Sequence, residues 1–178
     1  HVSLLTSLED DEILALTPEP FSILSLPIPN KANITLFDCL DFYCLFEKLE
    51  GDNAWYNEKT KEKQDVNKGI VFWSLPTILI IDLKRFTNFN KKINNRIDIP
   101  INDVDLRKYI KGYNKESYIY DLYGICNHMG NCNGGHYTAY VKNANNKWYE
   151  FNDTLVNEIK EENLISEKSY CLFYRKKK

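Results

Sequence analysis

Two glycines directly before a histidine form the segment of this sequence best suited to catalysis. Gly134 and Gly135 lead into His136, and the β-prone residues Tyr137 to Tyr140 follow. Glycines at the end of a strand let a substrate or a second backbone approach closely, because no Cβ stands in the way. A neutral imidazole can take up a proton near neutral pH, so His136 is a candidate general base.

A polar pair, Asn152 and Asp153, ends the next β-prone segment, residues 147–151. Asn145 and Asn146 signal a turn before that segment, and a hairpin turning there would bring the polar pair beside His136. A carboxamide or carboxylate oxygen that accepts a hydrogen bond from one imidazole nitrogen fixes the tautomer and leaves the other nitrogen free to act as a base. The pattern alone favours a purely structural histidine over a catalytic one.

The cysteines offer no clear nucleophile for such a base. They are Cys39, Cys44, Cys126, Cys132 and Cys171. An odd number without a Cys-x-x-Cys pair indicates reduced thiols in an intracellular protein, and it favours neither disulfides nor a cysteine-rich zinc site. Only Cys132, four residues before His136, could substitute for a nucleophile, and a free surface thiol is the better interpretation of it.

Composition excludes several classes of protein. A chain of 178 residues with 43% hydrophobic residues can bury a core of its own. Its formal net charge is −2, so the chain lacks the positive electrostatic field of a dedicated nucleic-acid binder. The longest apolar run, at Ile78 to Ile81, is far shorter than the ~20 residues of a membrane-spanning helix. We expect no nucleic-acid partner and no membrane partner.

The pattern of elements predicts an α+β fold with a mostly antiparallel sheet. One amphipathic helix begins after Thr35 and continues through Leu45 and Phe46 to Gly51. The apolar run Ile78 to Ile81 predicts a central strand that is covered on both faces. Residues 1–20 suit an edge hairpin or connector, and residues 57–68 a solvated hairpin tip or loop. Further strands are expected at 21–27, 70–73, 117–127, 135–142, 147–151 and 168–175, and one helical turn at 160–164.

Several segments together resemble the histidine-box half of the ubiquitin-specific proteases, the ubiquitin carboxyl-terminal hydrolases of the papain-like cysteine peptidase class. They run in the same order as in that family and cover nearly the whole chain. They are Phe21 to Pro29, Thr35 to Leu40, Leu75 to Phe86, Tyr120 to Gly130, Gly134 to Tyr140, Trp148 to Asp153 and Ser169 to Tyr174. The resemblance implies a palm sheet and β-fingers that cradle ubiquitin, and a helical thumb that carries the nucleophile.

The resemblance also assigns roles to individual residues. It implies that His136 is the general base, that Asn152 is the third triad member orienting it, and that Asp153 is an adjacent polar residue of the site. Gly134 and Gly135 would let the narrow Gly-Gly tail of ubiquitin pass.

For two further residues, the role that the resemblance implies has a stated alternative. Tyr137 would form a wall of the channel for the ubiquitin tail, although simple packing on the strand is an equal alternative. His128 matches the Asn-His-x-Gly loop of the family near the tail, and a structural or loop-positioning role is favoured there over catalysis.

The sequence departs from the family in two places. Nothing resembles the Asn-x-x-Cys box of the thumb, so we expect the thumb on a segment before His1 or on another chain. Many members also carry two Cys-x-x-Cys pairs in the fingers, and zinc needs four N or S donors. The corresponding positions here hold Ser7, Asp10, Asn57 and Thr60. We expect no metal and no cofactor, with the fingers held by strand pairing and by the burial of Trp55 and Trp73.

The predicted protein is thus the C-terminal portion (1–178) of a ubiquitin-specific protease, with fingers at about 1–75 and palm at about 76–178. Its expected activity is thiol-dependent hydrolysis after the C-terminal glycine of ubiquitin. Its expected partners are ubiquitin, ubiquitinated proteins and the missing thumb, in the cytoplasm or the nucleus. The competing hypothesis is a catalytically inactive ubiquitin-binding or scaffold module.

Overall fold

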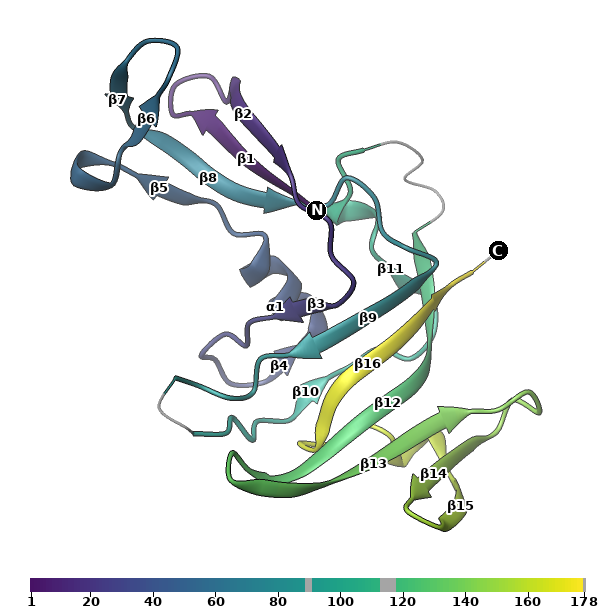
Figure 1. Cartoon of the computed structure of the whole chain (residues 1–178). Coiled ribbons are helices and arrows are strands. Elements are labelled where there is room, and N and C mark those ends of the chain that lie inside the picture. The colour runs from purple at the N-terminus through teal and green to yellow at the C-terminus, as the bar shows by residue number, and fades with distance from the viewer. Residues whose placement is uncertain (89–90, 113–117, 178) are drawn as a thin grey trace.

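A computed structural model describes residues 1–88, 91–112 and 118–177. These residues form two main β-sheets and one short α-helix, and the smaller sheet projects from one end of the larger one (Figure 1). The α+β class with a mainly antiparallel sheet is therefore confirmed.

The smaller sheet contains four strands in the order β2-β1-β8-β5. The strands are β1 (Val2–Ser7), β2 (Ile13–Pro18), β5 (Glu47–Leu49) and β8 (Val66–Val71). The pairing of β1 with β2 is the edge hairpin predicted for residues 1–20. A separate hairpin of β6 (Trp55–Asn57) and β7 (Glu62–Gln64) confirms the solvated tip predicted for residues 57–68.

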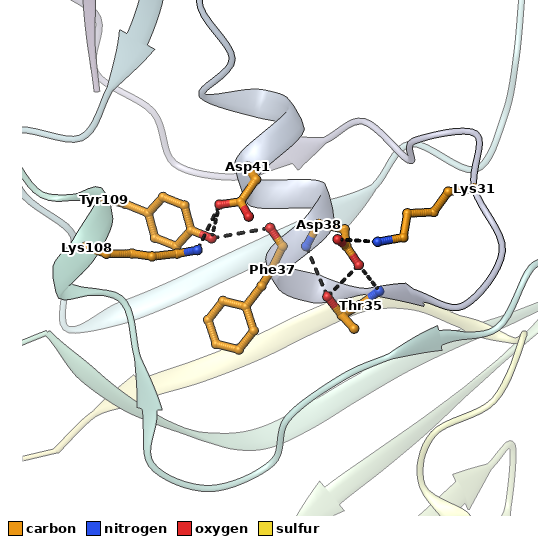
Figure 2. Close-up of polar contacts among 7 residues, drawn as sticks. All are labelled: Lys31, Thr35, Phe37, Asp38, Asp41, Lys108 and Tyr109. Atoms are coloured by element: carbon orange, nitrogen blue, oxygen red, sulfur yellow. Dashed lines mark hydrogen bonds and ion pairs between the residues drawn. The ribbon is translucent and has the colours of Figure 1, made fainter.

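Helix α1 (Leu36–Tyr43) begins with a capping box. The Asp38 backbone N–H donates to Thr35 Oγ1 at 3.1 Å, and the Thr35 backbone N–H donates to Asp38 Oδ2 at 2.8 Å (Figure 2). These two bonds satisfy donors that the first helical turn leaves without partners. Lys31 adds an ion pair to the same carboxylate at 2.7 Å, and the pKa of Asp38 falls to about 2 because of the hydrogen bonds from Lys31 and Thr35.

The end of this helix was predicted wrongly. It stops at Tyr43, and Cys44 caps it with a backbone N–H to the Leu40 carbonyl at 3.0 Å, whereas the sequence predicted continuation to Gly51. Leu45 and Phe46 are exposed, and the next residues form β5 against β8. Pairing with a distant strand overrides the local helical period here.

A second polar group holds α1 against the 3₁₀ turn η2 (Arg107–Tyr109). The Tyr109 hydroxyl donates to Asp41 Oδ1 at 2.7 Å and to the Phe37 carbonyl at 3.3 Å, as Figure 2 shows. Lys108 forms an ion pair with Asp41 at 2.9 Å. These contacts fix the helix on one side of the larger sheet.

Among the described residues the larger sheet has eight strands. Seven follow the order β15-β14-β13-β12-β16-β9-β3, and β11 (Val104–Asp105) pairs with β12. In that order the strands are β15 (Leu155–Ile159), β14 (Trp148–Asn152), β13 (Gly134–Lys142), β12 (Ile119–Asn131), β16 (Ser169–Lys176), β9 (Ile78–Leu83) and β3 (Leu24–Leu26). Only β3 and β9 pair in parallel among these seven. Residue 117, the predicted start of β12, lies outside the described residues.

Short elements connect these strands. Strands β4 (Ile34–Thr35) and β10 (Ile97–Asp98) pair in parallel beside α1. The 3₁₀ turn η1 (Gly51–Asn53) follows β5, and η4 (Glu161–Asn163) supplies the helical turn predicted at 160–164. Of the helices in the described part of the chain, none is long and apolar enough to cross a membrane.

The prediction of a central strand at Ile78 to Ile81 was wrong. Strand β9 is next to the edge strand β3, and its burial alternates: Leu79 and Ile81 are buried, whereas Ile78 is 37% exposed. The residues from Ile78 to Ile81 are apolar on both faces of the strand, so the sequence pattern could not show which face is buried.

The hydrophobic core lies between one face of the larger sheet and α1. Its fully buried side chains include Leu26, Leu36, Ile81, Tyr120 and Leu172. Outside this core, Trp55 of β6 is half-buried, but Trp73, which follows β8, is 40% exposed, so the predicted burial of Trp73 was wrong.

Candidate active site

His136 is the third residue of β13 and lies at the end of the β13–β14 hairpin. Its Nε2 atom lies 2.7 Å from Oδ1 of Asn152, the last residue of β14. The turn between the strands is closed by hydrogen bonds between Asn143 and Lys147 and between Asn146 and Asn143, each 2.9 Å long. The turn signal at Asn145 and Asn146 therefore predicted this pairing correctly.

The contact determines which nitrogen of His136 can act. Because an amide oxygen only accepts hydrogen bonds, Nε2 carries the proton when it faces Asn152 Oδ1. In the neutral ring Nδ1 then holds the free lone pair. The side chain is 44% exposed, so Nδ1 can be reached by a group that needs to lose a proton.

Asp153 follows Asn152 directly and stands at the edge of this site. Its Oδ2 atom lies 3.9 Å from His136 Nε2, and its side chain is 79% exposed. Its backbone has a φ of 51°, in the left-handed region, where the chain turns toward β15. At this distance and exposure, water weakens the attraction between its carboxylate and a protonated imidazole.

His128 lies on β12 and is buried within an aromatic cluster. Its ring centroid is 4.7 Å from that of Tyr137, 5.4 Å from Phe86 and 5.8 Å from Tyr170. Its Nδ1 has no hydrogen-bond partner among the described residues. Burial, assisted by the charge of Lys92, lowers the pKa of His128. The ring is therefore neutral near pH 7 and packs as an aromatic group.

The two glycines before His136 differ in their surroundings. A Cβ on Gly135 would lie 2.4 Å from His128 Nε2 and 2.3 Å from the Met129 carbonyl oxygen, so this glycine permits close packing of β13 on β12. A Cβ on Gly134 would meet nothing within 4 Å. Tyr137, on the other side of His136, is 55% exposed.

A cavity of about 390 Å³ lies at the turn between β12 and β13, and residues on either side of His136 line it. The predicted substrate-binding residues Gly134, Gly135, Tyr137 and His128 all line it. The remaining lining residues are Phe86, Thr87, Asn131 and Cys132. The structure thus brings the predicted glycine and aromatic residues together around one cavity, whose lining does not include His136, Asn152 or Asp153.

Four of the five thiols are poor partners for His136. Burial raises the pKa of Cys39, Cys44 and Cys171 to about 11, and it also raises the pKa of Cys126. A thiol with a raised pKa is mostly protonated at neutral pH and reacts slowly. Cys132 is exposed on the turn between β12 and β13.

The fingertip positions use hydrogen bonds inside their own turns. Ser7 Oγ accepts from the Glu9 backbone N–H at 3.1 Å, and Asn57 Oδ1 accepts from the Lys59 backbone N–H at 2.9 Å. Within the described ranges, no group of three or more His, Cys, Asp or Glu side chains could hold a metal ion. Whether the protein binds zinc stays a prediction.

Sequence reasoning missed Arg85, which is fully buried beside the aromatic cluster. Its Nε donates to the Ser169 carbonyl at 2.7 Å, and its Nη1 donates to the carbonyls of Ile93 and Asn95 at 3.0 and 2.9 Å. These bonds join the start of β16 to the loop whose Lys92 Nζ donates to the His128 carbonyl at 2.6 Å. The only signal in the sequence was an arginine two residues after an apolar strand.

Comparison with known proteins gives this arrangement its context. The profile described as "Ubiquitin carboxyl-terminal hydrolase" matches residues 32–174, which include the whole His136 hairpin. The chain belongs to the ubiquitin carboxyl-terminal hydrolase family. It is 42% identical over 149 residues to ubiquitin carboxyl-terminal hydrolase 10 of Arabidopsis thaliana and 46% identical over 147 residues to ubiquitin carboxyl-terminal hydrolase 12 of Saccharomyces cerevisiae.

Those matches cover 81% and 79% of this chain, but the chain spans only 16% and 12% of the two relatives. Among solved structures, the chain is similar to a SAGA DUB module of Ubp8, Sgf11, Sus1 and Sgf73 bound to monoubiquitin, with a TM-score of 0.85 and 31% identity. The same module bound to ubiquitin aldehyde gives a TM-score of 0.84 and 30% identity. Each comparison covers 99% of this chain and 40% of the other, which corresponds to the fingers and palm portion of a ubiquitin-specific protease.

Proposed function

We propose that this chain supplies the base and the ubiquitin-binding surface of a cysteine-type deubiquitinase. The observation that carries the proposal is the 2.7 Å contact between His136 Nε2 and Asn152 Oδ1, which leaves Nδ1 free as a base. The nucleophilic cysteine comes from residues outside these 178, either before His1 or on another chain. The raised pKa values of the buried thiols support that source.

In the proposed reaction, His136 Nδ1 takes the proton of the incoming thiol and forms a thiolate–imidazolium pair. The thiolate attacks the carbonyl carbon of the C-terminal glycine of ubiquitin, and donors outside this chain stabilise the oxyanion. Nδ1–H then protonates the leaving lysine amine. His136 finally accepts a proton from the water that releases ubiquitin from the sulfur. Asn152 holds the ring in orientation throughout, and Asp153 assists at the edge of the site.

The cavity lined by the residues on either side of His136 would receive the tail of ubiquitin. Gly134 and Gly135 place no side chain in the path of the Gly-Gly end, and the exposed Tyr137 ring forms one wall. His128 supports that wall from beneath through its ring contact with Tyr137. Relatives of this fold solved with monoubiquitin and ubiquitin aldehyde support ubiquitin as the partner.

The division into fingers at about 1–75 and palm at about 76–178 belongs to the same proposal. Strand β3 lies within the first of these ranges but adds to the sheet of the second. Ubiquitinated proteins in the cytoplasm or the nucleus would be the substrates, and the thumb that carries the nucleophile would pack against the palm near His136.

The proposal is tested on the intact protein that contains this chain, with a fluorogenic ubiquitin-amide reporter. His136→Ala should remove nearly all turnover, while Asn157→Ala, a substitution of an exposed asparagine on β15, should leave it unchanged. Near-unchanged kcat/KM in the His136 variant would refute the assignment of the base. Ubiquitin binding without turnover in the unmodified protein would instead support the inactive binding module.

A further inference from the structure

Two cysteines face each other across neighbouring strands of the larger sheet. Cys126 of β12 is the direct register partner of Cys171 of β16 in an antiparallel ladder. Directly opposed residues of such a ladder have their side chains on the same face. Both thiols are free and half-buried.

The backbone spacing at this position fits a disulfide bond. Opposed Cα atoms in an antiparallel pair are about 4.5 or 5.5 Å apart, depending on the hydrogen-bonding position. Disulfides join Cα atoms that are about 4.4 to 6.8 Å apart. The ladder also shifts its register between Cys126 and Asn127, so this part of the sheet can adjust locally.

We propose that Cys126 and Cys171 form a reversible disulfide when the protein meets a peroxide. One thiolate attacks a peroxide oxygen, which breaks the O–O bond and gives a sulfenic acid and, after protonation, water. The second thiol then attacks the sulfenic sulfur, forms the S–S bond and releases a second water. The two thiols together lose two electrons and two protons, and hydrogen peroxide is reduced to two waters.

The remaining thiols are less suited to this chemistry. Cys39 is fully buried on α1, and Cys44 caps the same helix. Cys132 is exposed on a turn, where oxidation would stop at a sulfur acid. Only the opposed pair combines access to a small oxidant with a second thiol in reach.

The pKa values of the Cys126 and Cys171 thiols determine how fast the disulfide forms. Burial raises the pKa of both thiols, and Asp82, the register partner of Cys171 on β9, raises that of Cys171 further. Because the thiolate is the reactive form, bridging should be slow at pH 7 and should accelerate about tenfold per pH unit up to pH 9.

The bridge would form beside the proposed channel. His128 is two residues after Cys126 on the same face of β12, and Tyr170 directly precedes Cys171. These two side chains belong to the aromatic cluster under Tyr137. Oxidation would therefore join the two strands that carry this cluster.

The test uses the protein of residues 1–178 with hydrogen peroxide, followed by blocking of free thiols and tryptic digestion without reduction. We expect the peptide of residues 116–142 to be joined to that of residues 169–175, with fragment ions placing the bond on Cys126. Dithiothreitol should release the two peptides. Because the unmodified protein is analysed, no variant needs to fold for this result.

Two variants complete the test. Cys132→Ser, which removes the exposed thiol from the same tryptic peptide, should leave the bridge unchanged, and Cys171→Ser should abolish it. A bridge through Cys132 would overturn the proposal. Absence of the bridge at a peroxide dose that converts Cys132 to a sulfinic acid would overturn it as well.

Discussion

The contrast between Gly134 and Gly135 gives the sharpest test of how β13 is held. A methyl group on Gly135 would lie 2.3 Å from the Met129 carbonyl oxygen and 2.4 Å from His128 Nε2, whereas ordinary contact begins at 3.4 Å. The end of β13 must therefore move by about 1 Å or His128 must leave its pocket. Overpacking of this kind costs about 1–3 kcal/mol. For a chain of this size, Gly135→Ala should lower Tm by about 2–12 °C.

Gly134→Ala is the matched control, because its methyl group would meet nothing within 4 Å. Its Tm should equal that of the unmodified protein when both are measured by circular dichroism on residues 1–178. In the intact protein, Gly135→Ala should lower turnover of a ubiquitin-amide reporter by about 100-fold if His136 shifts by about 1 Å. Equal Tm values for the two variants would refute the packing argument.

Four further outcomes are expected. Asn152→Ala should reduce kcat about 10- to 150-fold, which corresponds to about 1.5–3 kcal/mol for a hydrogen bond to a charged ring. Asp153→Ala should reduce kcat less. If steady-state kinetics showed the reverse order, the orienting role would move to Asp153. Residues 1–178 alone should not cleave the reporter, and activity that Cys132→Ala abolishes would contradict this. Elemental analysis should find no zinc, and EDTA should leave Tm unchanged, because the fingertip turns are held by hydrogen bonds. Burial lowers the pKa of His128 in the folded state, so its contribution to stability is complete above pH 6.5 and is lost as pH falls through the folded pKa. His128→Gln should therefore flatten the loss of Tm between pH 7 and pH 5.

The parts of the site that local sequence could predict are those held by local geometry. The proposed base and its proposed orienting amide lie on one hairpin, which the turn residues Asn145 and Asn146 and the flanking β-prone segments identified. Thr35 likewise marked the start of α1 correctly, and the structure shows that Asp38 completes a capping box with it. In each case the decisive hydrogen bonds join residues that are close in the sequence.

The parts that could not be predicted depend on distant contacts. The apolar spacing of Leu45 and Phe46 continued the helical period, but β5 pairs with β8, and Phe46 packs on Gly69 of that strand. Arg85 binds carbonyls of residues that the sequence places in separate segments, so no local pattern marks it. Burial of His128 depends on rings from three other parts of the chain.

The register of the β13–β14 hairpin determines where this protein can tolerate changes in length. The ladder is fixed by the pairs from Ala139 with Phe151 to Lys142 with Trp148, and the closing turn lies beyond them. An insertion in residues 143–147 would lengthen an exposed turn and leave the contact between His136 and Asn152 in place. A single insertion between Trp148 and Asn152 would instead reverse the face on which Asn152 lies and separate it from His136. Natural variation in length among close homologues should therefore gather at the turn, and both strands should keep a constant number of residues.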